Sequence, residues 1–509
     1  MFSNLPAQPP HRLARLGSAL MCAGLFLAFT GAPVVAAEAP EIESTAAITG
    51  ASAQNQGMSG LGPAGTATMH GDAQSSDTTP HPGPGNRGLS VVHKTKFAAC
   101  PTILMDSTGM VWTLCTKIVG RAPVAEILDP ATGDTLASLD IEKGALLGGV
   151  YAYLDDYDRL VLVNGKNELL KISKHHNPDG TWGLAAQQRI DVSHFVNSGG
   201  SQGDGVVGLT PDTQGNIWLA TREGKVGIVS AEADGSRIPE IEHVNFPNGE
   251  RVDNSISASQ QGVAIATSHA LYLLDSATDQ KSGAVTPRIT WRNSYDRGSA
   301  RKPGQLSWGS GATPSFFGPA GNDEYVTITD NADGQSNLLV YKSTDGSLVC
   351  KQGIFGTSGS GTENSAIAYS DSVIVASTYG YPYPTVPEGA GPSNPPLASF
   401  VGGMEKIQVR ADGEGCEKQW DKPIASSAVP RLSTVDNTIY TMERPSFHGI
   451  TGLGFDAITI DADTGNVTSR TRMAETPLQD SLQMVGTISP DGVWWQGTIS
   501  GVVRMQAVE

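Results

Sequence analysis

The sequence is poor in charged and aromatic residues. Charged side chains make up 17% of its 509 residues and aromatic side chains 6%, whereas an ordinary soluble domain has about 25% charged residues. Because Lys, Glu and Arg are strong helix formers, their scarcity argues against long helices. The formal net charge of −17 also excludes the basic surface that nucleic-acid binding requires.

Three motifs of common metal, nucleotide and haem sites are absent from the chain. The sequence has no H-E-x-x-H, no G-K-[ST] and no C-x-x-C, which excludes zinc-protease, P-loop and c-type haem sites of the usual kind. Residues 358–365 (SGSGTENS) are rich in small residues, but they precede an expected strand rather than a helix. We therefore expect no nucleotide site there.

The first 37 residues are typical of a secretory signal peptide. Arg12 and Arg15 precede an apolar core at residues 16–31, and residues 35–37 (VAA) provide small side chains for cleavage. The apolar core is shorter than the roughly 20 residues of a membrane-spanning helix. The sequence therefore predicts a signal peptide at residues 1–37, a secreted or periplasmic protein, and no transmembrane segment after cleavage.

Residues 38–88 consist largely of Ala, Gly, Ser, Thr and Pro and have no apolar periodicity. This composition is typical of disordered linkers. We expect a disordered tether over residues 38–88 and a folded domain over residues 89–509.

Four cysteines remain outside the signal peptide: Cys100, Cys115, Cys350 and Cys416. An even number in an exported protein permits two disulfides. Cys100 and Cys115 flank one expected hairpin and can pair with each other. Cys350 and Cys416 occupy similar places in successive repeats, which is a weaker indication that they pair.

One pattern recurs from residue 90 onward, namely four short strands separated by tight turns. In its clearest copy, residues 205–243, the strands VVGLTPD and IWLATRE are joined by TQGN and followed by an outer hairpin. Turn sequences such as STG, ADG and SPDG separate the strands. Four-strand units of about 40 to 50 residues are typical of a β-propeller.

The all-β fold predicted from these repeats is a β-propeller with eight four-stranded blades, with seven blades as the alternative. The last unit, residues 482–505, has room for only three strands. Residues 89–97 (LSVVHKTKF) can supply the missing outer strand. This N-terminal strand would close the ring and remove an exposed sheet edge.

Several turns between the third and fourth strands share a D-x-x-T-G sequence or a near form of it. They start LDPATG at Leu128, LDSATD at Leu274, YKSTDG at Tyr341 and IDADTG at Ile460. These turns resemble those of quinoprotein-type propellers, in which a tryptophan follows. Here Leu136, Val349 and Ser469 take its approximate place. The resemblance implies the architecture of that family, whereas the replaced tryptophans argue against its pyrroloquinoline quinone cofactor.

Three acid–asparagine pairs occur in the middle of the chain. They are Asp253 and Asn254, Asp330 and Asn331, and Glu363 and Asn364. Such pairs resemble the axial metal ligands of calcium-dependent propeller hydrolases of the paraoxonase and gluconolactonase type. In the propeller pattern all three pairs lie at strand ends on one face. Because Ca²⁺ prefers six to eight carboxylate and amide oxygens, we expect a calcium site there. The alternative is that these residues only form turns.

Two histidines, His269 and His448, lie in turns expected on the same face. A histidine there can act as a general acid or base, although a turn histidine with no role is the alternative. The sixth unit also carries an insert over residues 379–400, in which Tyr379, Tyr381 and Tyr383 offer aromatic side chains. We expect this insert to bind substrate as a lid, or to be a solvated insertion.

These observations support three functional hypotheses. The first is an exported, calcium-assisted hydrolase or lactonase acting on a small-molecule or glycan substrate at the axial opening. The sequence does not distinguish this enzyme from a lyase that uses His448 or a tyrosine at the same site. The second is a non-catalytic binding propeller. The third is a quinone-dependent dehydrogenase. The substrate and the oligomeric state stay open.

Overall fold

The computed structural model describes residues 58–508, except for residues 145–150, 198–202, 280–283, 388 and 445–453. The predicted signal peptide lies outside the described residues. Within them the only helices are α1 (Ser193–Asn197) and the 3₁₀ helices η1 (Pro247–Gly249) and η2 (Pro477–Gln479). The all-β prediction is confirmed.

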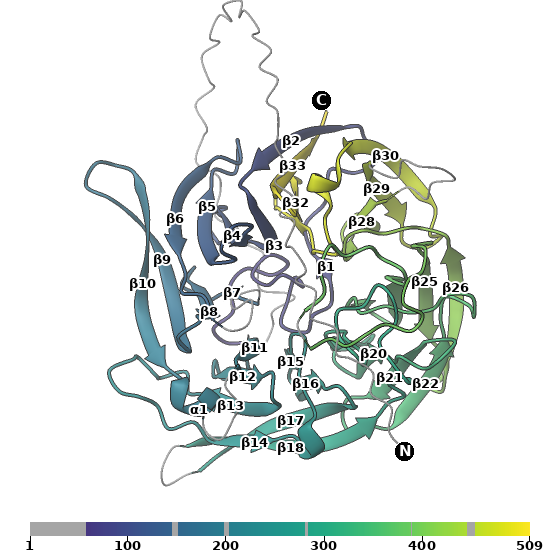
Figure 1. Cartoon of the computed structure of the whole chain (residues 1–509), viewed down its shortest axis with the longest axis horizontal. Coiled ribbons are helices and arrows are strands. Elements are labelled where there is room, and N and C mark those ends of the chain that lie inside the picture. The colour runs from purple at the N-terminus through teal and green to yellow at the C-terminus, as the bar shows by residue number, and fades with distance from the viewer. Residues whose placement is uncertain are drawn as a thin grey trace, which may run out of the picture. The chain divides into compact units, whose positions relative to one another are not determined.

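Eight sheets follow one another in chain order around a common axis (Figure 1). This arrangement confirms the eight-bladed β-propeller. In blades 1 to 7 the innermost of the four blade strands comes first in the chain. The strands of each blade are named from the innermost outward. Blade 1 consists of β3 (Ala98–Met105), β4 (Val111–Lys117), β5 (Pro123–Leu128) and β6 (Thr135–Asp140), and blade 2 of β7 (Tyr153–Leu154), β8 (Leu160–Val163), β9 (Glu168–His176) and β10 (Trp182–Asp191). Blade 3 consists of β11 (Val206–Pro211), β12 (Ile217–Thr221), β13 (Lys225–Val229) and β14 (His243–Asn245), and blade 4 of β15 (Ser257–Ser259), β16 (Gly262–Ala266), β17 (Ala270–Thr278) and β18 (Val285–Ser294).

The second half of the ring repeats this order. Blade 5 consists of β19 (Ser315–Phe317), β20 (Tyr325–Thr329), β21 (Asn337–Lys342) and β22 (Leu348–Gly353), and blade 6 of β23 (Ile367–Tyr369), β24 (Ser372–Ala376), β25 (Met404–Val409) and β26 (Cys416–Lys422). Blade 7 consists of β27 (Arg431–Ser433), β28 (Thr438–Glu443), β29 (Phe455–Asp461) and β30 (Val467–Ala474). Blade 8 consists of β31 (Thr487–Ile488), β32 (Trp494–Thr498), β33 (Gly501–Ala507) and, as the outermost strand, β2 (Leu89–Thr95).

Strand β2 closes the ring, as the sequence predicts. It pairs antiparallel with β33 from Leu89 opposite Ala507 to Thr95 opposite Gly501. The strand that precedes blade 1 therefore completes the last blade and closes the ring (Figure 1).

An aspartate in the turn between the first and second strands stabilises several blades. In blade 1, Asp106 accepts the N–H groups of Thr108 and Met110 and the indole N–H of Trp112, the last at 2.8 Å. In blade 3, Asp212 binds the indole N–H of Trp218 in the same way at 3.0 Å. Both tryptophans are buried between blades. The turn and the interblade core are thus fixed by one carboxylate.

Both predicted disulfides are present. Cys100 and Cys115 join the paired strands β3 and β4, and Cys350 and Cys416 join the outermost strands of blades 5 and 6. Two disulfides are typical of exported proteins. Across the described part of the chain, no helix has the length and apolar character needed to span a bilayer.

The predicted tether is wrong for residues 58–88, because most side chains of residues 61–81 are buried on the propeller axis. We call residues 61–81 the axial segment. Within it, β1 (Thr78–Thr79) pairs parallel with β27. Its carbonyls accept hydrogen bonds of 2.7–3.1 Å from innermost-strand residues of six blades. The donors are Met105, Leu154, Ala258, Phe316, Ala368 and Leu432. The segment therefore satisfies backbone donors that a hollow channel would expose.

Candidate functional site

All three predicted acid–asparagine pairs emerge on one face of the propeller. This rim face carries the loops that join one blade to the next and the turns between second and third strands. Asp253 precedes β15, Asp330 follows β20 and Glu363 precedes β23. The strand order therefore agrees with the predicted placement of these pairs on one face.

Asp330 and Asn331 form hydrogen bonds with the loops next to them. The Asp330 carboxylate accepts the backbone N–H and the side-chain amide of Asn337, at 2.7 and 2.8 Å. The Asn331 amide donates to the carbonyls of Arg297 and Ala300, at 2.8 and 2.9 Å. Burial raises the pKa of Asp330, and the hydrogen bonds from Asn337 oppose that rise. This pair serves the turn, as the alternative interpretation predicts.

The remaining members of the pairs also have local partners. Asp253 lies 3.5 Å from the Arg251 guanidinium and 3.7 Å from that of Arg222. The Asn364 amide donates to Gln483 at 2.8 Å. In the described ranges, no three His, Cys, Asp or Glu side chains lie close enough together to hold a metal ion. Calcium binding by the six predicted residues stays a prediction, because three of them are Asn residues, whose oxygens can also be calcium ligands.

Two of the pairs nevertheless approach each other at Gly311, in the loop between β18 and β19. The Asn254 amide donates to the Gly311 carbonyl. A Cβ on Gly311 would lie 2.9 Å from the Cβ of Glu363, and its φ of +66° is left-handed. Glycine is required at this position for both reasons. Asn254 and Glu363 thus lie on either side of one backbone segment.

Glu363 is a buried carboxyl group that lacks a full set of partners. Its side chain is 9% exposed, and its Oε2 accepts the N–H of Leu306. Its Oε1 is buried without a hydrogen-bond partner among the described residues. Burial raises the pKa of Glu363 to about 7, against the lowering effects of the Leu306 N–H, the Tyr383 hydroxyl and the Arg301 charge. The group can therefore gain or lose a proton near neutral pH.

Tyr151 connects Asn254 with the region around Glu363. Its hydroxyl donates to the Oδ1 of Asn254, which also accepts the Thr313 hydroxyl at 3.2 Å. Burial raises the pKa of Tyr151, and the nearby charge of Glu363 raises it further. Tyr151 therefore stays protonated and acts as a hydrogen-bond donor.

A cavity lies below Tyr151 on the propeller axis. It has about 340 Å³ of empty space, which includes solvent at its opening. The axial segment contributes Met69, His70 and Asp72 to its lining, and Tyr151 and Ser255 come from the rim loops. We call this region, together with Asn254 and Glu363, the axial mouth.

His70 belongs to a buried cluster with Asp77 and Ser365. Its Nδ1 lies 3.0 Å from Asp77 and 3.2 Å from the Ser365 hydroxyl, which itself donates to Asp77. In a serine-hydrolase triad the hydroxyl and the carboxylate bind opposite nitrogens of the ring. Here both bind Nδ1, so the cluster orients the imidazole and does not activate Ser365 as a nucleophile.

Of the two histidines predicted from the sequence, His269 is described by the structure, and its partners lie outside this cluster. The ring nitrogens of His269 bind the Ser268 hydroxyl at 2.8 Å and the Arg297 guanidinium at 2.9 Å. Burial lowers the pKa of His269, and the charge of Arg297 lowers it further. His269 therefore supports Arg297 in this structure. His448 lies outside the described residues.

The tyrosines of the insert do not form the open aromatic surface that the sequence suggests. Tyr381 is buried, donates its hydroxyl to Asp480 and packs against Phe400 with 5.1 Å between ring centroids. Tyr379 is half-buried and covers Gly359. The ring of Tyr383 is tilted by 57° against that of Tyr381, with 4.9 Å between their centroids, and its hydroxyl lies near Glu363. Only Tyr383 of these three adjoins the axial mouth in the described structure.

Sequence reasoning missed Tyr151, His70 and Asp77. His70 and Asp77 fall in the segment that was set aside for its composition, and Tyr151 starts a blade without a recognisable motif. A signal was available, because a His and two Asp within eight residues (HGDAQSSD, residues 70–77) are unusual in a linker of small residues.

The chain matches no protein-family profile. It is 26% identical over 326 residues to an uncharacterised protein of Archaeoglobus fulgidus, and the matched region covers 60% of this chain and 61% of that protein. The chain thus spans less than two thirds of the length of this relative.

Among solved structures, the propeller is similar to two quinohemoprotein alcohol dehydrogenases. The enzyme of Comamonas testosteroni aligns with a TM-score of 0.52 and 11% identity, over 86% of this chain and 80% of that chain. The enzyme of Pseudomonas putida aligns with a TM-score of 0.51 and 12% identity, over 87% and 80%. At this level of identity the likeness concerns the fold, so the chain shares its eight-bladed propeller with quinoprotein alcohol dehydrogenases.

Proposed function

We propose that the protein is an exported hydrolase of carboxylic esters or lactones that works by general acid–base catalysis at the axial mouth. The observation that supports this proposal is the Glu363 carboxyl, which is buried, has a free Oε1 and has a pKa of about 7. Strongly shifted pKa values are concentrated at functional sites, and a general base works best when its pKa lies near the working pH. Export is inferred from the predicted signal peptide and the two disulfides.

In the proposed reaction the Glu363 carboxylate takes a proton from a water molecule as its oxygen attacks the substrate carbonyl. The new C–O bond forms, and the bond from the carbonyl carbon to the leaving oxygen breaks. Glu363 then returns the proton to the leaving oxygen. Tyr151 keeps its own proton because burial raises its pKa. In the reaction its hydroxyl would turn from Asn254 Oδ1 to the carbonyl oxygen as negative charge develops there.

Neither calcium nor a quinone enters this proposal. The acid–asparagine pairs do not bring three carboxylates together. The structural neighbours are quinohemoprotein enzymes by name, so a quinone-dependent dehydrogenase stays an alternative function. The observation against it is that Leu136, Val349 and Ser469 stand where the tryptophan of the quinoprotein turns is expected.

Replacing Glu363 by Gln tests the proposal. The variant keeps the shape of the side chain but cannot accept the proton, so hydrolysis should fall by about 10²- to 10⁴-fold. The measurement is kcat/KM on a panel of p-nitrophenyl esters and γ- and δ-lactones.

Glu405→Gln is the matched control, because Glu405 is another buried glutamate of blade 6 but pairs with Lys418 at 2.9 Å. It should retain the parent activity once its folding is verified. Equal rates for Glu363→Gln and the parent would overturn the proposal. A parent protein inactive on the whole panel would instead favour a binding propeller.

A further inference from the structure

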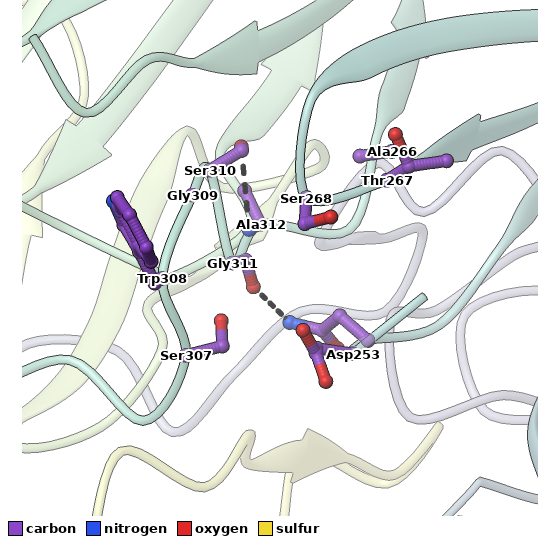
Figure 2. A pocket seen from close by; sticks show the side chains of 11 residues that line it. Asp253, Ala266, Thr267, Ser268, Ser307, Trp308, Gly309, Ser310, Gly311 and Ala312 are labelled. Carbon is purple, nitrogen blue, oxygen red and sulfur yellow. Dashed lines mark hydrogen bonds between the residues drawn. The ribbon is translucent and has the colours of Figure 1, made fainter. Parts of the chain in front are cut away.

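A second, smaller pocket lies on the rim face beside the axial mouth (Figure 2). We call it the outer pocket. It is a shallow depression with about 220 Å³ of empty space, which includes the open solvent above it. Asn254 belongs to both sites. A ligand in the outer pocket would therefore rest on its surface and extend into solvent.

Trp308 forms an aromatic wall of the outer pocket (Figure 2). Its side chain is 39% exposed. The Arg297 guanidinium lies 3.8 Å from the ring centroid, and the indole N–H donates to the Arg297 carbonyl at 3.0 Å. His269 in turn holds the Arg297 side chain at 2.9 Å. The ring plane is therefore fixed before any ligand arrives, which lowers the entropic cost of binding.

The loop that carries Trp308 is held close to its neighbours by two glycines. A Cβ on Gly309 would lie 2.6 Å from the Tyr295 hydroxyl, and Gly311 has the contact with Glu363 described above. Tyr295 also accepts the N–H of Ser310 at 2.9 Å. The backbone of this loop therefore forms a rigid side of the pocket.

The polar groups of the outer pocket are hydroxyls, one amide and one carboxylate. They come from Ser268, Ser307, Ser310, Asn254 and Asp253, and the lining contains no Lys or Arg. The neighbouring cations already have partners in the pocket wall, since Arg222 and Arg251 lie 3.7 and 3.5 Å from Asp253 and Arg297 covers one side of the Trp308 ring. A phosphate or carboxylate ligand would have to compete with these contacts. A neutral ligand with several hydroxyl groups would find acceptors and donors around it.

We propose that the outer pocket binds one ring of a neutral saccharide. The apolar C–H face of the sugar would stack on Trp308, and its hydroxyl groups would bind Asp253, Asn254 and the serines. This binding does not require catalysis by Glu363. If both proposals hold, a sugar ring in the outer pocket would place its substituent next to the axial mouth, because Asn254 belongs to both sites.

The test is binding of fluorescently labelled neutral hexasaccharides, measured by anisotropy. The probes are β-1,4-glucan, β-1,4-mannan, α-1,4-glucan and β-1,4-N-acetylglucosamine hexamers. Adenosine is the control ligand, because its base can stack on an aromatic side chain although it is not an oligosaccharide. At least one hexasaccharide should bind the parent. Trp308→Ala should weaken that binding by about tenfold or more, because it removes the stacking surface.

Asp253→Asn, which preserves the side-chain shape, is the second variant and should also weaken binding. Tyr157→Ala is the control, because Tyr157 is 73% exposed in the β7–β8 turn on the opposite face. Glu405→Gln, whose side chain pairs with Lys418, should also bind the hexasaccharide like the parent. Binding is measured without turnover, so a failure of the catalytic proposal leaves this result intact. The proposal is overturned if no hexasaccharide binds, if only adenosine binds, or if both pocket variants bind like the parent.

Discussion

Arg431 and Glu363 are both ionisable residues that are buried near the innermost strands of the propeller. Arg431 is fully buried, and its guanidinium donates to the carbonyls of Thr78, Gly486 and Met69. The charges of Asp72 and Asp77 oppose the lowering of the Arg431 pKa that burial causes. Glu363 is almost as buried, but one of its oxygens has no partner among the described residues.

The difference between these groups shows how burial can serve either structure or chemistry. A buried charge with complete hydrogen bonds holds two parts of the chain together. A buried carboxyl without them has a shifted pKa and a free oxygen, which are the properties of a proton-transfer group. We therefore assign Arg431 to the fold and Glu363 to the function.

The largest expected effect is that of Arg431→Ala on stability. The substitution leaves three buried carbonyls unpaired and removes the positive charge near Asp72 and Asp77, so it should cost about 3–5 kcal/mol in the free energy of unfolding. Urea unfolding followed by tryptophan fluorescence measures this cost.

The control for Arg431 is Arg288→Ala, since Arg288 pairs with Asp275 on an outer blade edge with a side chain 68% exposed. It should leave the urea midpoint almost unchanged. If Arg431→Ala unfolded at the same midpoint as this control, Arg431 would not be what holds the axial segment.

A smaller effect is expected for Tyr383→Phe. The Tyr383 hydroxyl lowers the pKa of Glu363, so its removal should raise that pKa further. The acidic limb of the pH profile of kcat/KM should then move to higher pH by less than about one unit. Tyr379→Phe, on the same insert, should not move the profile. A shift to lower pH in Tyr383→Phe would contradict the assigned role of this hydroxyl.

The fold could be predicted because its signals are local and repeated. The last unit lacks room for a fourth strand, and this shortage led to the assignment of residues 89–97 as the closing strand. The pairing of Cys100 with Cys115 follows from their places on one hairpin. The shared face of the three acid–asparagine pairs follows from strand order alone.

The site could not be predicted as well, because it depends on non-repeating loops. Residues 295–314 bring Gly311 against Glu363, whereas Asp330 accepts hydrogen bonds within its own turn. This loop has no sequence periodicity from which its path could be predicted. The axial segment was missed for a related reason. A narrow channel accepts mainly small side chains, so a segment that fills it has the same Ala-, Gly-, Ser- and Thr-rich composition as a disordered linker.

The most direct test of the role of Glu363 is the pH dependence of stability, compared between the parent and Glu363→Gln. The pKa of Glu363 is about 7 in the folded protein, above its ordinary value of 4.5, so folding favours the protonated form. Relative to the variant, the parent should lose free energy of unfolding as the pH rises from about 4.5 to about 7, by about 3 kcal/mol in total. A difference between the two proteins that stays constant from pH 4 to pH 8 would contradict the account.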